Sequence, residues 1–317
     1  MAAVQAAIPA GLNAADERHH RPGSGRLWSE SWYFDFVTRD GSLGGYVRFG
    51  LYPNLRACWY WACVVGEGRR LVTVVDHEVT PPRQQSLELR GEGLWADHTV
   101  EVPYEHMSLG CEAFALGLDE PAAVYGPGPP LGERVPFGLD LEWETDGHVY
   151  PYPGGVTRYE VPCRVHGEVL VGDERIELDA VGQRDHSWGE RDWWTLSWTW
   201  TAGWLEDGTR FHGTALRYGD DVLAYFPGYV QAPGGEIDSG GRTAATAELG
   251  PAGLPTAATF ALGELDLEID PVAVAPVLLA SPDGRSSRLP RALCRFRDRA
   301  TGRRGVGWTE WNQPQYP

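Results

Sequence analysis

The chain has 317 residues, 14 of them Trp and 40 Gly, and a formal net charge of −17. All 27 basic residues are Arg, which excludes Schiff-base chemistry, pyridoxal phosphate anchoring and a P-loop, because each needs a lysine amine. The acidic balance argues against binding nucleic acid or adsorbing to anionic lipid, since both need a basic face.

Residues 1–25 hold no sustained hydrophobic period, and we expect a tail there with a short helix around residues 14–19. From Trp28 onward, short segments alternate apolar and polar residues and are separated by turn residues, which is the pattern of β-strands. No long segment holds a 3.6-residue period. Strands are expected in the first part of the chain at 28–36, 46–52, 58–65, 71–79 with an interruption at 76–78, 87–94, 99–104, 139–145, 157–170 and 174–181.

The segment 120–136 is rich in Pro and Gly, so we expect a loop that serves as a lid or as a linker. The second half continues with strands at 194–201, 211–218, 222–229 (turning at Gly219-Asp220), 259–269 and 292–312. Short strands with turns between them are typical of a sandwich or a barrel. The segments 39–50 and 206–219 resemble each other weakly. Each follows a Trp-rich strand, begins with a turn of the type Asp-Gly-Ser/Thr and ends with Arg, an aromatic residue and Gly. This similarity suggests a duplicated β domain.

The most unusual stretch is 182–194, which holds three carboxylates, two Arg, one His and three Trp. Aromatic walls with a few polar groups set into them suit an apolar cavity that contains chemistry. The strict alternation from Trp194 to Thr201 then predicts a strand with an indole-rich face. A buried ion-pair corner, with Arg184 or Arg191 against Asp185 or Asp192, explains the same composition equally well.

Acid-initiated chemistry on an alkene needs a proton donor held in an apolar wall, because burial keeps a carboxyl group protonated. Asp185 is the leading candidate donor, and His186 either tunes it or donates the proton itself. The alternative role for Asp185 is an ion pair with Arg191. Glu190 and Asp192 are reserve acids.

Indole faces can stabilise a cationic intermediate. From the second half we expect Trp188, Trp194 and Trp198 to supply such faces. From the first half, Glu30 and Trp32 are candidate substrate-binding residues, although core packing explains Trp32 more simply.

The sequence has no H-x-H, H-E-x-x-H or C-x-x-C motif, no G-x-S-x-G and no nucleotide fingerprint, so we expect neither a metal nor a cofactor. Five scattered Cys indicate reduced thiols in a cytoplasmic protein. Residues 1–10 lack the features of a signal peptide, and no apolar run approaches the length of a membrane span. We therefore expect no stable membrane insertion, and a monomer or homodimer.

Two landmarks carry a resemblance. The E-x-W-Y strand at Glu30-Ser31-Trp32-Tyr33 and the D-H-x-W-G motif at 185–189 resemble those of the AttH and carotenoid 1,2-hydratase group of double lipocalin-like proteins, to which tocopherol cyclase and lipocalin-like Diels–Alderases are distantly similar. The resemblance implies two β-barrel domains that meet across a hydrophobic pocket, with cofactor-free hydration, cyclisation or pericyclic chemistry on polyenes. This sequence departs from the group in having Gln183-Arg184 where an aromatic residue and Met are usual.

Together these observations predict an all-β protein of two lipocalin-like, calycin-like barrel domains, 26–172 and 173–317, after a tail at 1–25. The expected function is a cofactor-independent hydratase or cyclase for a hydrophobic isoprenoid or polyketide. A non-catalytic carrier of a lipophilic ligand is the main alternative, and a structural partner protein whose Trp residues only fill a core is a third.

Overall fold

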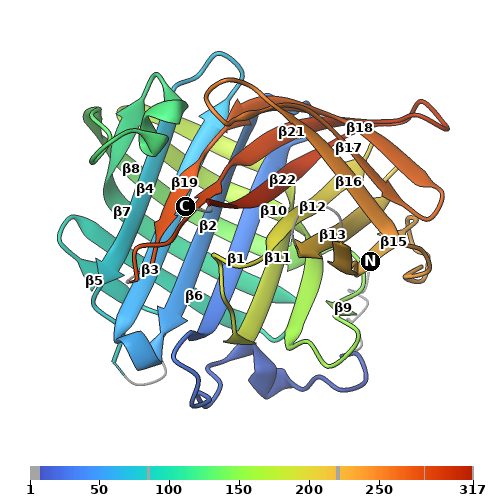
Figure 1. Cartoon of the computed structure of the whole chain (residues 1–317), viewed down its shortest axis with the longest axis horizontal. Coiled ribbons are helices and arrows are strands. Elements are labelled where there is room, and N and C mark those ends of the chain that lie inside the picture. The colour runs from blue at the N-terminus through green and yellow to red at the C-terminus, as the bar shows by residue number, and fades with distance from the viewer. Residues whose placement is uncertain (1–7, 84–85, 219–221, 282, 316–317) are drawn as a thin grey trace.

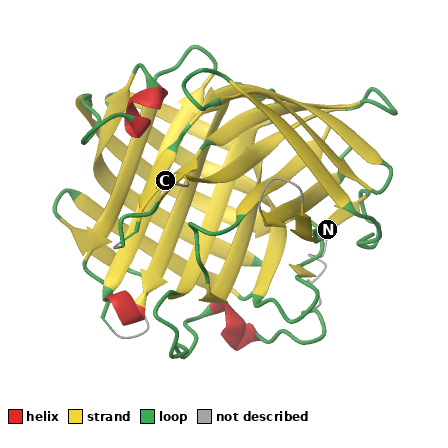
Figure 2. Ribbon diagram, viewed as in Figure 1, coloured by secondary structure: helices red, strands yellow, loops and turns green. Residues whose placement is uncertain are grey.

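The computed structural model describes residues 8–83, 86–218, 222–281 and 283–315. Within these residues the protein is built of antiparallel strands with three short 3₁₀ helices, and it contains no α-helix (Figures 1 and 2). The all-β fold class expected from the sequence is confirmed. Among the same residues, no helix has the length and apolar character that crossing a membrane requires.

The first sheet curls on itself and closes. Its strands run in the order β4-β3-β2-β1-β11-β10-β8-β7-β6-β5, and a further pairing of β4 with the end of β7 completes the ring. The members are β1 (Trp28–Thr38), β2 (Leu43–Tyr52), β3 (Ala57–Gly66), β4 (Leu71–Val79), β5 (Leu89–Gly91), β6 (Leu94–Val102), β7 (His106–Leu118), β8 (Glu133–Thr145), β9 (Tyr150–Pro151, on β10), β10 (Arg158–Val171) and β11 (Glu174–Glu190).

The second sheet packs across the first (Figure 1). Its main path is β14-β13-β12-β22-β21-β18-β17-β16, with β15 beside β13 and the pair β19–β20 beside β22. The members are β12 (Ser197–Leu205), β13 (Arg210–Tyr218), β14 (Val222–Tyr225), β15 (Gly228–Gln231), β16 (Thr243–Leu249), β17 (Pro255–Leu262), β18 (Leu265–Val274), β19 (Val277–Ala280), β20 (Ser286–Leu289), β21 (Arg291–Asp298) and β22 (Arg304–Gln315).

The chain passes from the first sheet to the second between Glu190 and Ser197, which is later than the expected division after residue 172. The charged stretch therefore lies mostly on β11, a 17-residue strand of the first sheet. The strand expected from Trp194 begins only at Ser197. Strand β4 continues through the expected interruption at 76–78, but its pairing with β3 shifts register there, between Asp76 and Val79. The expected turn at Gly219-Asp220 lies outside the described residues.

Three large apolar cores and a small cluster of Tyr150, Tyr152 and Tyr229 follow from this arrangement. The first core lies inside the closed sheet and includes Trp32, Phe34 and Trp143. The second is formed by residues of the second sheet, among them Phe260 and Phe296. The third lies between the sheets. There the indole of Trp308 donates to the carbonyl of Phe36 at 2.9 Å, so aromatic side chains of one sheet bond to the backbone of the other.

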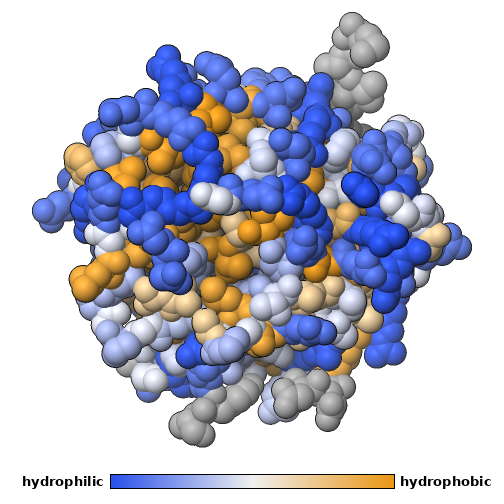
Figure 3. Space-filling model, turned by 90° about the horizontal axis from the view of Figure 1, so that it is seen from above, coloured by the Kyte–Doolittle hydropathy of each residue, from blue (hydrophilic) through white to orange (hydrophobic). Residues whose placement is uncertain are grey.

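The 3₁₀ helices η1 (Ala14–Glu17), η2 (Pro53–Leu55) and η3 (Pro121–Tyr125) lie outside the sheets. Helix η3 and the start of β8 occupy parts of the expected loop at 120–136. Seen from above, hydrophobic groups show between hydrophilic ones over this face (Figure 3). Such mixing is ordinary for a protein surface, because polar groups cannot cover all of it.

Candidate active site between the two sheets

Alternation along β11 decides which way each side chain of the charged stretch points. Strand β11 pairs with β1 on one side and β10 on the other, which places Asp185 opposite Tyr33 and Glu160. Consecutive side chains of a strand point to opposite faces. Asp185 therefore faces the second sheet, while Arg184 and His186 face the interior of the closed sheet.

The pairing of β1 with β11 is interrupted at the start of this stretch, between Phe34–Arg184 and Val37–Val181. A side chain at Gly182 would place its Cβ only 2.1 Å from the carbonyl oxygen of Asp35, so glycine allows β1 and β11 to approach closely here. The backbone N–H of Gln183 then donates to the Asp35 carboxylate at 2.8 Å instead of to a backbone carbonyl. Asp35 thus holds the strands together and points away from Glu30 and Trp32.

A cavity of about 270 Å³ lies between the sheets, and Asp185 is part of its wall. Charged groups from both sheets reach it, including Arg158 from β10 and Glu310 from β22. The aromatic members of the wall are Tyr33, Tyr152, Trp193, Trp198, Trp200 and Tyr225. This combination of an aromatic lining and a few polar groups is typical of small-molecule sites.

A larger hollow of about 640 Å³ lies on the outer side of the first sheet, along β6, β7 and β8. It is the more open of the two, and of its three acidic residues Glu112 and Asp140 are exposed to solvent and Glu168 is half-buried. An open surface hollow does not enclose an apolar substrate as a closed cavity does. We therefore place the candidate active site in the smaller cavity.

Asp185 is 5% exposed and pairs with Arg158, whose Nη2 donates to Oδ2 at 2.8 Å. Burial raises the pKa of Asp185 to about 7, with Arg158 acting in the opposite direction. The ion pair predicted between Asp185 and Arg191 does not form. Instead, Arg158 lies between Asp185 and Glu160 and bonds to both.

Glu160 is fully buried and accepts hydrogen bonds from the indole of Trp200 at 3.1 Å, the amide of Gln183 at 3.1 Å and the hydroxyl of Tyr152 at 3.3 Å. Burial alone would raise its pKa, but Arg158 and these bonds bring the pKa below its usual range. Glu160 is therefore ionised, whereas its neighbour Asp185 gains and loses its proton close to neutral pH. Two acids held apart in this way can take separate acid and base roles.

The other candidates near Asp185 have different surroundings. Trp198 lines the cavity and donates to Glu310 at 2.7 Å. Glu190 and Asp192 also line it, but Glu190 is exposed and Asp192 pairs with Arg285 at 2.9 Å. Trp194 is buried between the sheets, where its indole donates to the carbonyl of Leu279, and it is not part of the cavity wall.

The remaining candidates meet inside the closed sheet. His186 and Glu30 approach to 3.1 Å between Nε2 and Oε1, so the two sequence landmarks touch each other. His186 stacks on Trp32, and Trp188 stacks on His20. His186 therefore lies on the opposite face of β11 from Asp185 and contacts Glu30, not Asp185.

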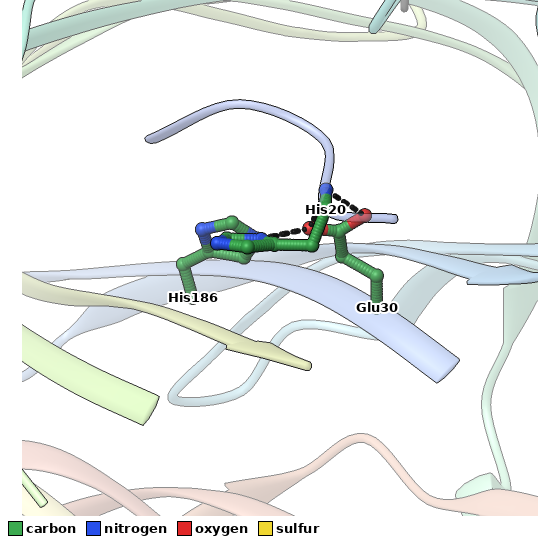
Figure 4. Close-up of side chains that lie close together, drawn as sticks. All are labelled: His20, Glu30 and His186. Atoms are coloured by element: carbon green, nitrogen blue, oxygen red, sulfur yellow. Dashed lines mark hydrogen bonds and ion pairs between the residues drawn. The ribbon is translucent and has the colours of Figure 1, made fainter. Parts of the chain in front are cut away.

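Among the described residues, His20, Glu30 and His186 of this cluster form a group whose side-chain atoms could hold a metal ion. The ligand atoms of His20, Glu30 and His186 lie within 4.8 Å of one another (Figure 4). Two His and one carboxylate suit a zinc-type ion. Hydrogen bonds already join these atoms: Glu30 accepts from Nδ1 of His20 at 2.7 Å, and His186 Nδ1 donates to the carbonyl of Asp16 at 2.7 Å. The bonds fasten the N-terminal segment to β1 and β11.

Sequence reasoning missed Arg158, Glu160 and the contacts of the N-terminal segment, although a short helix does form within the expected 14–19, as η1. Arg158 and Glu160 alternate with apolar residues on β10, a pattern that usually indicates a solvent-facing side. Only a second sheet packed on that side makes them buried. Residues 13–20 have no periodicity, yet Glu17 is fully buried and pairs with Arg184 at 2.9 Å.

A closed sheet and a second sheet that enclose an aromatic cavity define the double lipocalin-like class, and comparison with solved structures bears this out. A candidate AttH protein from Nitrosomonas europaea superposes with a TM-score of 0.61 at 14% identity, over 93% of this chain and 95% of that one. Kievitone hydratase from Nectria haematococca gives 0.61 at 10% identity, over 91% and 90%. CghA, solved with Sch210972, gives 0.54 at 11% identity, over 94% and 93%.

The chain belongs to the family described as a domain of unknown function, DUF7064, whose model matches residues 13–315. A search of curated proteins finds no significant match. The expected kinship with AttH-like double lipocalin-like proteins is confirmed at the level of the fold.

Proposed function

We propose that the protein is a cofactor-independent hydratase or cyclase that acts on a hydrophobic isoprenoid or polyketide in the cavity between the two sheets. The observation that carries this proposal is Asp185, a buried carboxyl group with a raised pKa in a wall of indoles. The fold is shared with a protein named as a hydratase, which supports the same reaction class.

The proposed reaction begins when protonated Asp185 donates its proton to an alkene carbon of the substrate, forming a C–H bond and leaving a carbocation. The faces of Trp193, Trp198 and Trp200 stabilise that cation. Water adds to it in a hydration, or an internal nucleophile of the substrate adds to it in a cyclisation. The proton released in that step returns to the Asp185 carboxylate, which Arg158 holds in place.

All five cysteines are unpaired and buried. Such thiols suit a reducing compartment, and we propose a cytoplasmic location for the protein.

The first test is Asp185→Asn, which keeps the shape of the side chain but cannot supply the proton. We expect turnover of a substrate found by screening polyenes to fall by about 10²-fold or more, the usual share of general acid catalysis. Asp266→Asn is the matched control, because that carboxylate pairs with Arg299, is partly exposed and lies outside the cavity wall. Equal activity in the two variants, with both folded by circular dichroism, would contradict the acid role.

A carrier of a lipophilic ligand is the second candidate. The observation that favours it is the Arg158–Asp185 ion pair, which gives Asp185 a purely structural role when it is ionised. Mass spectrometry of ligands recovered after incubation separates the two functions. Unchanged mass and retention time across a panel of polyenes indicate a carrier, whereas a gain of one water or an isomeric product indicates the enzyme.

A further inference from the structure

Two guanidinium groups in the cavity wall have no acidic partner among the described residues. Arg48 projects from β2, and Arg191 follows the end of β11. The other two arginines of the wall are paired, Arg158 with Asp185 and Arg291 with Glu310 at 3.1 Å. Neither Arg48 nor Arg191 makes an ion pair with any residue that the structure describes. The cavity wall therefore presents two guanidinium groups that no carboxylate of the described residues pairs with directly.

Arg48 is only 3% exposed. Its Nη2 donates to the hydroxyl of Tyr52 at 3.3 Å, while its buried Nη1 has no acceptor. The guanidinium carbon lies 4.5 Å from the ring centre of Trp61 and 5.0 Å from that of Trp193. Aromatic faces offset part of the cost of burying a charge, but a buried donor without an acceptor still costs free energy.

The backbone leaves room for this guanidinium. Gly50 is two residues further along β2, and a Cβ there would lie 2.4 Å from Nη1 of Arg48. Residues two apart on a strand share a face, so any larger residue at position 50 would displace the Arg48 side chain. The conformation of Arg48 thus depends on a glycine beside it.

Arg191 approaches the same indole, with its guanidinium carbon 5.7 Å from the ring centre of Trp193. Burial lowers the pKa of Arg191 to about 10, and the nearby positive charges of Arg158 and Arg48 act in the same direction. Two cations therefore share one aromatic ring at the cavity wall.

We propose that the ligand of this cavity is a lipophilic acid, whose carboxylate or enolate oxygen is bound by Arg48 and Arg191 while its apolar body lies against Trp198 and Trp200. A guanidinium donates two parallel hydrogen bonds to a carboxylate, which gives such a pair both strength and orientation. The inference rests on the proposed function and narrows its substrate class. Arg48 and Arg191 would determine specificity, and Asp185 would act at the other part of the substrate.

The test uses two fluorescent dyes of nearly the same shape, 1-anilinonaphthalene-8-sulfonate and N-phenyl-1-naphthylamine, which differ in one anionic group. Binding to the full-length protein is measured by fluorescence titration at low and high salt. We expect the anionic dye to bind at least about tenfold more tightly than the neutral dye, an advantage that salt weakens. Arg48→Met and Arg191→Met should each remove most of that advantage and leave the affinity for the neutral dye nearly unchanged.

Arg297→Gln, an exposed arginine of β21, is the control and should leave both affinities as they are. If one variant fails to fold, the other variant and the comparison of dyes on the unaltered protein still decide the matter. Equal binding of both dyes, or a preference that survives both substitutions, overturns the acid-binding inference and leaves the proposed reaction standing. Failure of both dyes to bind overturns the cavity as a lipophilic site and the inference with it. Failure of the proposed function is detected by a different measurement: Asp185→Asn would then turn the substrate over as fast as the unaltered protein.

Discussion

At the scale of single residues, one step along a strand separates two different environments. Asp185 and His186 are neighbours in the sequence, yet Asp185 meets Arg158 in the cavity between the sheets and His186 meets Glu30 inside the closed sheet. Consecutive charged residues on one strand therefore divide between the cavity and the interior of the closed sheet. The sequence could predict that these residues are functional or structural partners, but not which partner each one has.

The titration of Asp185 gives a prediction at this scale. Burial raises its pKa from 3.8 to about 7, so the folded protein holds this proton more tightly than the unfolded chain does. The resulting stability is complete below about pH 4 and is lost as the pH rises through about 7. The unaltered protein should therefore lose stability relative to Asp185→Asn over that range, measured by urea unfolding at a series of pH values. The proposed acid role also requires kcat/KM to fall above about pH 7.

Asp192→Asn is the comparison for this measurement. Burial opposes ionisation of Asp192, but the hydrogen bonds from Arg285, the backbone of Trp194 and Thr195, with the charge of Arg285, together outweigh it and lower the pKa. Its contribution is therefore present above the unfolded pKa and is lost only as the pH falls. A stability difference for Asp185→Asn that is constant from pH 4 to 7 would show that this carboxyl group is already ionised in the folded protein.

At the scale of elements, the N-terminal segment packs into the closed sheet and bonds to its strands. Glu17 is the last residue of η1, and its side chain points into the interior of the closed sheet. There its carboxylate accepts a hydrogen bond from Nη1 of Arg184 at 2.9 Å. The indole of Trp32 donates to the carbonyl of Glu17, and His20 bonds to Glu30. Sequence patterns predict strands because strands repeat every two residues, whereas this segment is held by single contacts that no periodicity reveals.

Removal of the Glu17 charge tests this segment. Glu17→Gln leaves a buried guanidinium without its counter-ion, and we expect a loss of about 3–5 kcal/mol of unfolding free energy, as for other broken buried pairs. Glu174→Gln, which breaks the exposed pair with Arg69, should cost less than about 1 kcal/mol. Both are measured by denaturant unfolding. Replacing the pair together, as Glu17→Gln with Arg184→Met, should recover much of the loss, and no recovery would argue against this charge as the cause.

At the scale of the whole molecule, the sequence predicted the all-β class and the lipocalin-like resemblance because alternation and turn residues recur along the chain. It misplaced the start of β12, because Trp194 and Leu196 continue the alternating pattern although they precede the strand. We expected the second domain to begin at residue 173, shortly before the charged stretch. The strand that carries this stretch, β11, instead belongs to the first sheet, between β1 and β10. Pairing between distant strands decides such boundaries, and one sequence does not show it.

The shared core between the sheets predicts that the two halves unfold together. Trp308 on β22 is 1% exposed, packs against Tyr46 and donates to the carbonyl of Phe36. Trp308→Ala should cost about 3–5 kcal/mol, as for other large aromatic deletions in cores. Because the lost contacts belong to both sheets, tryptophan fluorescence and far-ultraviolet circular dichroism should report one common transition at a lower urea concentration. Separate transitions from the two probes in the unaltered protein would mean that the halves are independent, and the cavity between them would then lack the fixed walls that an oriented proton donor needs.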